Sequence, residues 1–134
     1  MLKKRLIACL IVRDGLIVQS VGFNKYLPIG YPRFSIEFVA RWDVDEIVLL
    51  DISSTKDNGS INKNTLKDLT KVCFVPLTVG GGIKSVDDAL NIIKAGADKF
   101  SINTYAVERP EIITEISEKF GSQCVVVSID CRLE

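Results

Sequence analysis

Apolar runs alternate with amphipathic stretches along the whole chain. The first apolar run, residues 6–12, is nearly continuous, as expected for a strand buried on both faces, and the amphipathic stretches repeat apolar residues at helical spacing. The predicted strands cover residues 6–12, 46–51, 74–79, 99–102 and 124–129, and the predicted helices begin at Pro32, Asn64, Ser85 and Pro110. This order, βαβαβαβαβ, requires parallel strands joined by right-handed crossovers.

Turn and cap residues separate these elements. Asp14-Gly15 predicts a tight turn into a short hairpin strand at residues 16–18. Residues 22–31 contain Gly, Asn and Pro and predict a mobile loop, and residues 53–62 predict a polar, turn-rich connection. The segment 85–88, Ser-Val-Asp-Asp, resembles a capping box for the helix that follows it.

The first predicted helix carries several large apolar side chains. They are Phe34, Phe38, Val39 and Trp42. Because they recur at helical spacing, we expect them to form the buried face, and we expect Trp42 to pack between the helix and the sheet.

Two architectures fit this order: an open doubly wound sheet, or part of a (β/α)₈ barrel. A dinucleotide-binding sheet places its glycines after the first strand, whereas here Gly80-Gly81-Gly82 follow the third, which favours the barrel. Such a barrel needs about 250 residues, so this chain of 134 residues holds about half of one, as a single domain 1–134. The fifth strand resembles the first, which suggests a barrel built by duplication and a chain that ends as the repeat begins.

Two strand-to-helix loops suit a phosphate group. Gly81 and Gly82 allow positive φ and a close approach of the backbone, and the helix behind them is expected to offer N–H groups and a positive dipole end. Asn103 and Thr104 follow the next strand, so their polar side chains would lie at the same edge of the sheet. The alternative is a tight turn and a helix cap, but two loops at matching strand ends favour an anion site.

Composition and charge exclude several partners. The chain is 47% hydrophobic, which is enough for one core, and its 17 basic and 17 acidic residues balance. No basic excess exists to bind a nucleic acid or a membrane surface. No segment approaches the length of a membrane span, and the basic start precedes a strand rather than a signal peptide, so we expect a soluble, cytoplasmic protein.

The cysteines and the absence of histidine limit the chemistry further. Cys9, Cys73, Cys124 and Cys131 are widely spaced, the first three lie in or beside apolar runs, and reduced thiols are expected. With no histidine and no Cys-x-x-Cys, we expect neither a metal ion nor another cofactor, and no Ser-His or Cys-His nucleophile.

Five segments together resemble one enzyme family. They read RLIACL, DEIVLLDI, TVGGGI, GADKFSINT and FGSQCVVVSID, at residues 5–10, 45–52, 78–83, 96–104 and 120–130. The chain resembles the N-terminal half of the cyclase subunit (HisF) of imidazole glycerol phosphate synthase. The resemblance implies a (β/α)₈ barrel that receives ammonia from a glutaminase subunit docked at its lower face and uses it on a phosphorylated nucleotide in histidine synthesis.

The resemblance assigns roles to individual residues. Gly82, Asn103 and Thr104, with neighbouring Gly81, correspond to the phosphate site of this half. Asp51 corresponds to a polar active-site position, and Asp130 to a catalytic carboxylate. Arg5, Glu46 and Lys99 correspond to the charged gate through which ammonia enters.

Strand parity supports these assignments in part. Arg5 and Ile11 share a face, as do Lys99 and Asn103, but Glu46 and Asp51 fall on opposite faces unless their strand contains a bulge. Without the resemblance, Arg5, Glu46 and Lys99 would be interpreted as a solvated barrel rim.

Two positions depart from the family pattern. Ile11 stands where the family has the Asp that works with Asp130 as an acid–base pair, and Gln19 stands where it has a Lys in the first loop. Losing one member of such a pair costs about 10²–10⁴ in rate. The departure resembles diverged paralogues that serve sugar-modifying amidotransferases.

Three functions therefore remain open. The first is an ammonia-using enzyme subunit, either the cyclase or a diverged paralogue acting in surface-sugar amidation. The second is a non-catalytic scaffold that relays ammonia from the glutaminase, and the third is the related single-chain isomerase, which needs no charged gate. We also expect self-association, because a half barrel leaves two sheet edges and an apolar lumen face uncovered.

Overall fold

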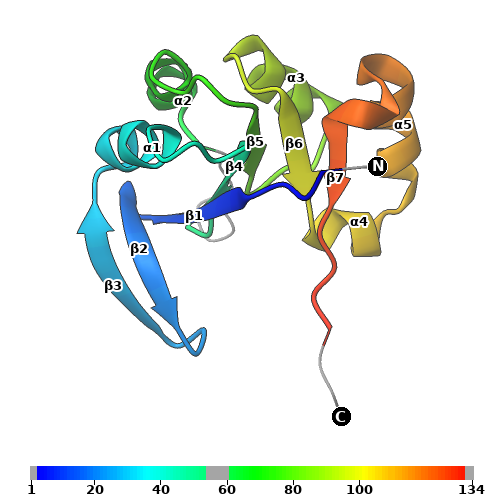
Figure 1. Ribbon diagram of the computed structural model, residues 1–134. Coiled ribbons are helices and arrows are strands. Elements are labelled where there is room, and N and C mark those ends of the chain that lie inside the picture. The colour runs from blue at the N-terminus through cyan, green and yellow to red at the C-terminus, as the bar shows by residue number, and fades with distance from the viewer. Residues whose placement is uncertain (1–2, 54–60, 132–134) are drawn as a thin grey trace.

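The computed structural model describes residues 3–53 and 61–131. Its elements follow one another in the predicted alternation, and Figure 1 shows α1, α2, α3 and α5 in an arc outside the strands. The elements are β1 (Ile7–Arg13), β2 (Leu16–Val21), β3 (Lys25–Gly30), α1 (Pro32–Ala40), β4 (Glu46–Asp51), α2 (Lys63–Thr70), β5 (Leu77–Gly80), α3 (Val86–Lys94), β6 (Lys99–Ile102), α4 (Thr104–Glu108), α5 (Glu111–Phe120), the 3₁₀ turn η1 (Ser122–Cys124) and β7 (Val125–Val127).

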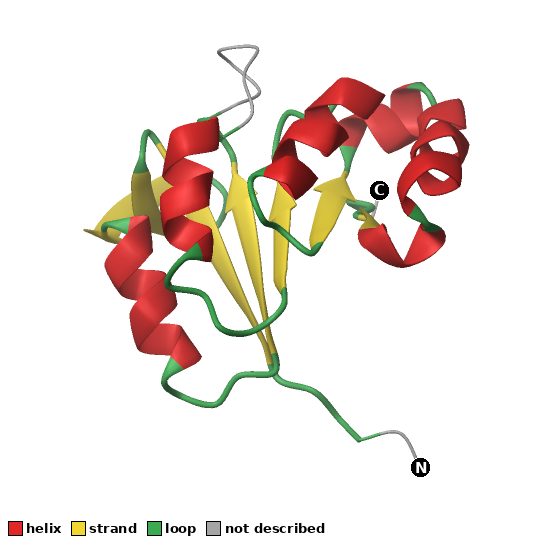
Figure 2. Ribbon diagram, turned by 90° about the horizontal axis from the view of Figure 1, so that it is seen from above, coloured by secondary structure: helices red, strands yellow, loops and turns green. Residues whose placement is uncertain are grey.

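The described strands form one sheet in the order β3-β2-β1-β4-β5-β6-β7. The five strands from β1 through β7 that alternate with helices run parallel, whereas β2 and β3 add an antiparallel hairpin beside β1. Figure 2 shows the strands and the outer helices from above. This arrangement is part of a (β/α)₈ barrel, as the sequence predicted.

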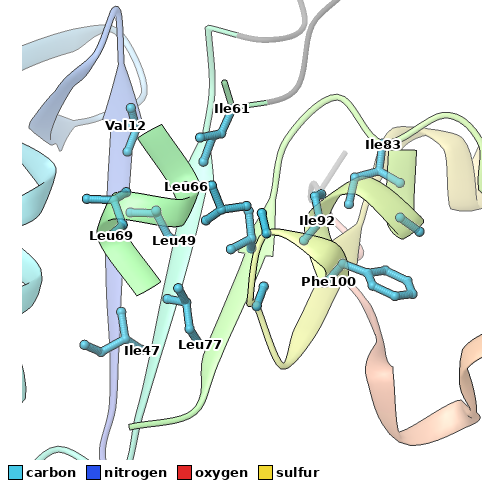
Figure 3. Close-up of a cluster of buried hydrophobic side chains, with 14 of the residues drawn as sticks. Val12, Ile47, Leu49, Ile61, Leu66, Leu69, Leu77, Ile83, Ile92 and Phe100 are labelled. Carbon is cyan, nitrogen blue, oxygen red and sulfur yellow. The ribbon is translucent and has the colours of Figure 1, made fainter. Parts of the chain in front are cut away.

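The hydrophobic core lies between the sheet and the helices. Alternate strand residues such as Ile47, Leu49 and Phe100 are fully buried, and they form one hydrophobic cluster with the inner faces of α2 and α3 (Figure 3). Leu66 and Ile92 supply those helical faces. Burying each such side chain is worth about 1.5–3 kcal/mol, so this layer carries most of the stability of the half barrel.

Residues 22–31 do not form the predicted mobile loop. Most of them belong to the β2–β3 hairpin, whose last strand lies at the edge of the sheet. Pro28 is tolerated there because an edge strand leaves one row of backbone groups unpaired. The guanidinium of Arg13 lies 4.5 Å from the ring centre of Tyr26, which links the hairpin to the end of β1.

The buried face of α1 also differs from the prediction. Pro32 occupies the first turn as expected, but Ile36 is the fully buried residue of this helix. Phe34, Phe38 and Trp42 are 66%, 57% and 68% exposed, so the expected packing of Trp42 against the sheet is wrong. The rings of Phe38 and Trp42 instead contact each other at 5.0 Å between centroids.

Several boundaries and caps can be compared with the sequence. Ser85 caps α3 as predicted, and the Asp14-Gly15 turn has positive φ at both residues. The third barrel strand is shorter than expected because it begins at Leu77, after Pro76, and leaves Phe74 88% exposed. The fifth begins after η1 and ends at Val127, two residues before its predicted end, and α4 was not predicted. The predicted connection at 53–62 falls largely outside the described residues.

Candidate functional site at the two ends of the lumen face

The face of the sheet turned away from the helices is here called the lumen face. Pairing aligns Cys9 with Val48, Val48 with Thr78, and Thr78 with Lys99, so these residues share one face. Their neighbours Ile47 and Leu77 point to the helical core. Cys9 is exposed on this open face and not buried as its apolar context suggested.

A buried carboxylate lies at the N-terminal end of the lumen face. Glu46 is only 5% exposed, and its Oε2 accepts a hydrogen bond from Lys99 Nζ at 3.0 Å. Its Oε1 accepts a second from Arg5 Nη1. The resemblance grouped these three residues, and the structure brings them into one ion-paired cluster.

The pairing changes the acidity of this group. The hydrogen bond from Lys99 lowers the pKa of Glu46 most, burial opposes it, and the charges of Lys99 and Arg5 lower it further. Glu46 is therefore held as a carboxylate, with both of its oxygens occupied.

Two aspartates that the sequence reasoning missed lie beside this cluster in the chain and bond backbone groups of other segments. Asp45 Oδ2 accepts the backbone N–H of Leu6 at 2.6 Å, and Asp98 Oδ2 accepts that of Leu77 at 2.8 Å. Each aspartate immediately precedes a charged residue of the cluster, Glu46 or Lys99. The sequence could have indicated them, because an Asp directly precedes a charged residue at both places. A carboxylate that accepts a backbone N–H from another segment fixes the position of the residue that follows it.

A cavity of about 320 Å³ lies at the opposite, C-terminal end of the strands. The four predicted phosphate-site residues all line it: Gly81, Gly82, Asn103 and Thr104. Gly81 and Gly82 have φ of 120° and 65°, which residues with a side chain rarely adopt. The structure therefore gathers the two loops around one space, as the sequence indicated.

The helix behind the glycine loop does not present its N-terminus as expected. Ser85 Oγ accepts the N–H of Asp88, and Asp88 Oδ2 accepts the N–H of Lys84 at 3.0 Å. Asp87 and Asp88 both lie in the first turn. The cap thus satisfies the N–H of Asp88, and the two carboxylates partly offset the positive end of the helix.

Further residues line the same cavity and were not singled out from the sequence. They include Lys84, Ser101, Tyr105, Glu108 and Ser128. The lysine could have been found, because it follows the glycine loop directly. Tyr105 and Glu108 could not, because they belong to the unpredicted helix α4.

Asp51 lies at the upper end of β4 but not on the lumen face. The strand pairs without a register shift, and Asp51 is opposite Val12, a core residue, so Glu46 and Asp51 fall on opposite faces. Asp51 Oδ1 accepts hydrogen bonds from the backbone N–H (2.9 Å) and the hydroxyl of Ser53. It borders both the main cavity and a smaller one of about 210 Å³ on the helical side.

The resemblance assigns a catalytic pair to the positions of Ile11 and Asp130. Asp130 is exposed beyond β7, and its Oδ2 accepts a hydrogen bond from Asn103 Nδ2 at 2.8 Å. Ile11 is half-buried on β1 and pairs with Leu50, which places it on the lumen face. No proton-transferring group stands at that position of β1.

The described residues also bear on metals and membranes. Between residues 3 and 53 and between 61 and 131, no three His, Cys, Asp or Glu side chains gather as a metal site requires. Within the same ranges, no helix has the length and apolar character needed to cross a bilayer.

A partial (β/α)₈ barrel with a charged cluster at one end of its strands and a glycine-lined cavity at the other defines the class of this protein. The chain belongs to the histidine biosynthesis protein family, whose family model matches residues 5–134. The resemblance to HisF-type subunits noted from the sequence is thereby confirmed.

Individual relatives agree with this family. A Streptococcus mutans (strain UA159) protein named imidazole glycerol phosphate synthase subunit HisF is 46% identical over 134 residues, which is 100% of this chain and 53% of the relative. A Vibrio vulnificus (strain YJ016) protein named "Putative imidazole glycerol phosphate synthase subunit hisF2" is 48% identical over 130 residues, 97% of this chain and 48% of the relative. The chain thus spans about half the length of the curated relatives it matches.

Proposed function

We propose that this chain is the half of a HisF-type subunit that takes in glutamine-derived ammonia and binds a phosphorylated small molecule. One observation carries the proposal: the Glu46 cluster and the glycine-lined cavity lie at opposite ends of one sheet. Ammonia enters at the Glu46 end from a glutaminase docked there, and the phosphate group is held at the Gly82 end. The names of the relatives, imidazole glycerol phosphate synthase subunits, support a phosphorylated small molecule as the ligand.

The chemistry at the C-terminal ends of the strands differs from that of the histidine-pathway cyclase. Ring closure needs one group to give a proton and another to remove one, and Ile11 does neither. Asp130 alone remains, hydrogen-bonded to Asn103. We therefore place the chain with paralogues that deliver ammonia to another acceptor, such as a surface sugar.

A non-catalytic ammonia relay is the second candidate. It is favoured by the same Ile11, because a relay needs the Glu46 cluster but no acid–base pair. It does not need the cavity, so retained phosphate binding separates the two: a relay without substrate would bind no phosphate, whereas an enzyme subunit binds it.

The test compares the two ends in one protein. The completed chain is this sequence fused to the part of the Streptococcus mutans relative that it does not cover. Titration with a HisH-type glutaminase should show Lys99→Glu weakening association at least about tenfold, because reversal places a second carboxylate beside Glu46. Phosphate binding should stay unchanged in that variant, and Gly82→Val should show the opposite pattern.

The control is Lys94→Glu, which reverses an exposed charge in the last turn of α3, in the helical layer rather than on the lumen face. Equal glutaminase affinity for Lys99→Glu and Lys94→Glu would exclude docking at the Glu46 cluster.

A further inference from the structure

A two-point attachment joins the segment before β1 to the start of β4. The backbone N–H of Leu6 donates to Asp45 Oδ2 at 2.6 Å, and the carbonyl oxygen of Leu6 accepts the backbone N–H of Asp45 at 2.9 Å. The N–H and the carbonyl of Leu6 are therefore both bonded to one residue. Two hydrogen bonds to the same partner fix the direction of the chain as well as its distance.

The attachment lies directly beside the ion pair between Arg5 and Glu46. Arg5 is the chain neighbour of Leu6, and Glu46 is the chain neighbour of Asp45. Residues 3–6 belong to no helix or strand, and β1 begins only at Ile7, so Arg5 extends from a segment outside the ladder of the sheet. Its side chain is 60% exposed, and holding such a long side chain on a buried carboxylate costs conformational entropy. The attachment at Leu6 lowers that cost because it fixes the backbone next to Arg5.

The same arrangement occurs beside the other cation of the cluster. The backbone N–H of Leu77 donates to Asp98 Oδ2 at 2.8 Å, and the carbonyl oxygen of Leu77 accepts the backbone N–H of Asp98 at 2.9 Å. Asp98 directly precedes Lys99, as Asp45 directly precedes Glu46. An attachment next to each of these two partners is what a device that positions the cluster requires.

We propose that Asp45 is a positioning residue of the Glu46 cluster, because its attachment to Leu6 fixes the point from which Arg5 reaches Glu46 Oε1. The consequence for activity rests on the proposed function, in which this cluster is the ammonia entrance. Asp45 then keeps the entrance in one arrangement without touching ammonia itself.

Substitution separates the geometry of Asp45 from its charge. Asn keeps an acceptor oxygen at the same place and removes the charge, Glu keeps the charge and displaces the oxygen by one methylene, and Ala removes both. The two kinds of effect have opposite signs at Glu46, whose charged partners are Lys99 and Arg5. Lys99 and, to a smaller extent, Arg5 lower the pKa of Glu46, so losing Arg5 raises it. Losing only the negative charge of Asp45 would lower this pKa further.

The experiment follows the side-chain carboxyl carbon of Glu46 by NMR through a pH titration of the chain, with Glu46→Gln to assign the signal. Asp45→Ala and Asp45→Glu should raise the pKa of Glu46 toward its value in Arg5→Gln, whereas Asp45→Asn should not raise it. Adding Asp45→Ala to Arg5→Gln should give no further rise, because both changes act through one contact. The control Asp68→Ala, which removes an exposed carboxylate of α2, should leave the pKa of Glu46 unchanged.

The outcomes separate the positioning role from the proposed function. In a chain whose thermal unfolding shows an intact fold, an unchanged or lowered pKa of Glu46 in Asp45→Ala would overturn the role of Asp45; Asp45→Glu decides the point if the alanine variant does not fold. Titration of the completed chain with the glutaminase tests the function. If Asp45→Ala raises the pKa while Lys99→Glu leaves glutaminase affinity unchanged, the positioning role stands and docking at the Glu46 cluster is wrong.

Discussion

Replacing Lys99 with methionine should destabilise the half barrel in a pH-dependent way. The substitution keeps the length of the side chain but removes the ammonium group that bonds Glu46 Oε2 at 3.0 Å. Glu46, which is only 5% exposed, then keeps Arg5 as its partner in the cluster. The side chain of Arg5 is 60% exposed, so it compensates the buried carboxylate only in part.

The structure bounds the size of this effect. Removing one partner of a fully buried ion pair costs about 3–5 kcal/mol, and an exposed pair is worth about 0–1 kcal/mol. The Lys99 side chain is 28% exposed and Arg5 remains, so we expect a loss of about 1–2 kcal/mol at pH 7. This corresponds to a decrease of roughly 3–6 °C in the unfolding midpoint of a domain of this size.

The pH dependence follows from the lowered pKa of Glu46. Because the folded-state pKa lies below the unfolded value of 4.5, the stabilisation is complete above the unfolded pKa and is lost as pH falls through the folded one. The difference between the unaltered chain and Lys99→Met should therefore be full at pH 7 and shrink well below pH 4.5. Denaturant unfolding across this range measures it.

Two controls make this prediction sharp. Lys94→Met removes an exposed lysine of α3 and should change stability by less than about 0.5 kcal/mol. Glu46→Gln combined with Lys99→Met should be less destabilised than Lys99→Met alone, because no buried charge is left without its partner. A Lys99→Met loss that is equal at pH 7 and pH 3 would refute the reasoning.

Three further predictions concern the cavity, the first helix and the open face. Gly82→Val should weaken phosphate binding at least about tenfold, while Gly22→Val, also at positive φ but in the hairpin, should not; equal titrations would refute the site. Ile36→Ala should cost about 2–5 kcal/mol and Trp42→Ala less than about 1 kcal/mol, with the reverse order in denaturant unfolding contradicting the observed face of α1. Sedimentation should show self-association at micromolar concentration, and a stable monomer would contradict it.

The sequence predicted the alternation of elements well because periodicity records burial directly. Strands such as β1 and β4 are largely apolar runs, and Ser85 identifies the start of α3 through its capping chemistry. These signals are local, so one sequence suffices to read them.

The sequence-based predictions were wrong where contacts between distant parts of the chain determine the structure. Phe34, Phe38 and Trp42 have helical spacing, but the sheet selects the face that carries Ile36. The hairpin strand β3 was hidden by Pro28, which only an edge position tolerates.

The candidate site divides in the same way. Glycines and polar residues at strand ends indicated the cavity, and the resemblance indicated the Glu46 cluster. The capping box at the start of α3 was recognised from the sequence only as a helix start, although it also places Asp87 and Asp88 in the first turn. The roles of Asp45 and Asp98 required the pairing of strands that are far apart in sequence.

The most direct measurement is cyclisation by the completed chain with ammonium salt in place of glutamine. Supplying ammonia directly bypasses the glutaminase, so the assay measures only the cyclisation at the C-terminal ends of the strands. We expect turnover about 10²–10⁴ below that of the Streptococcus mutans relative, because Ile11 cannot act with Asp130. Ile11→Asp should raise any residual rate, although Gln19 limits the gain. Turnover equal to that of the relative in the unaltered completed chain, or rescue by it of a histidine-requiring strain that lacks the cyclase, would contradict the proposed divergence.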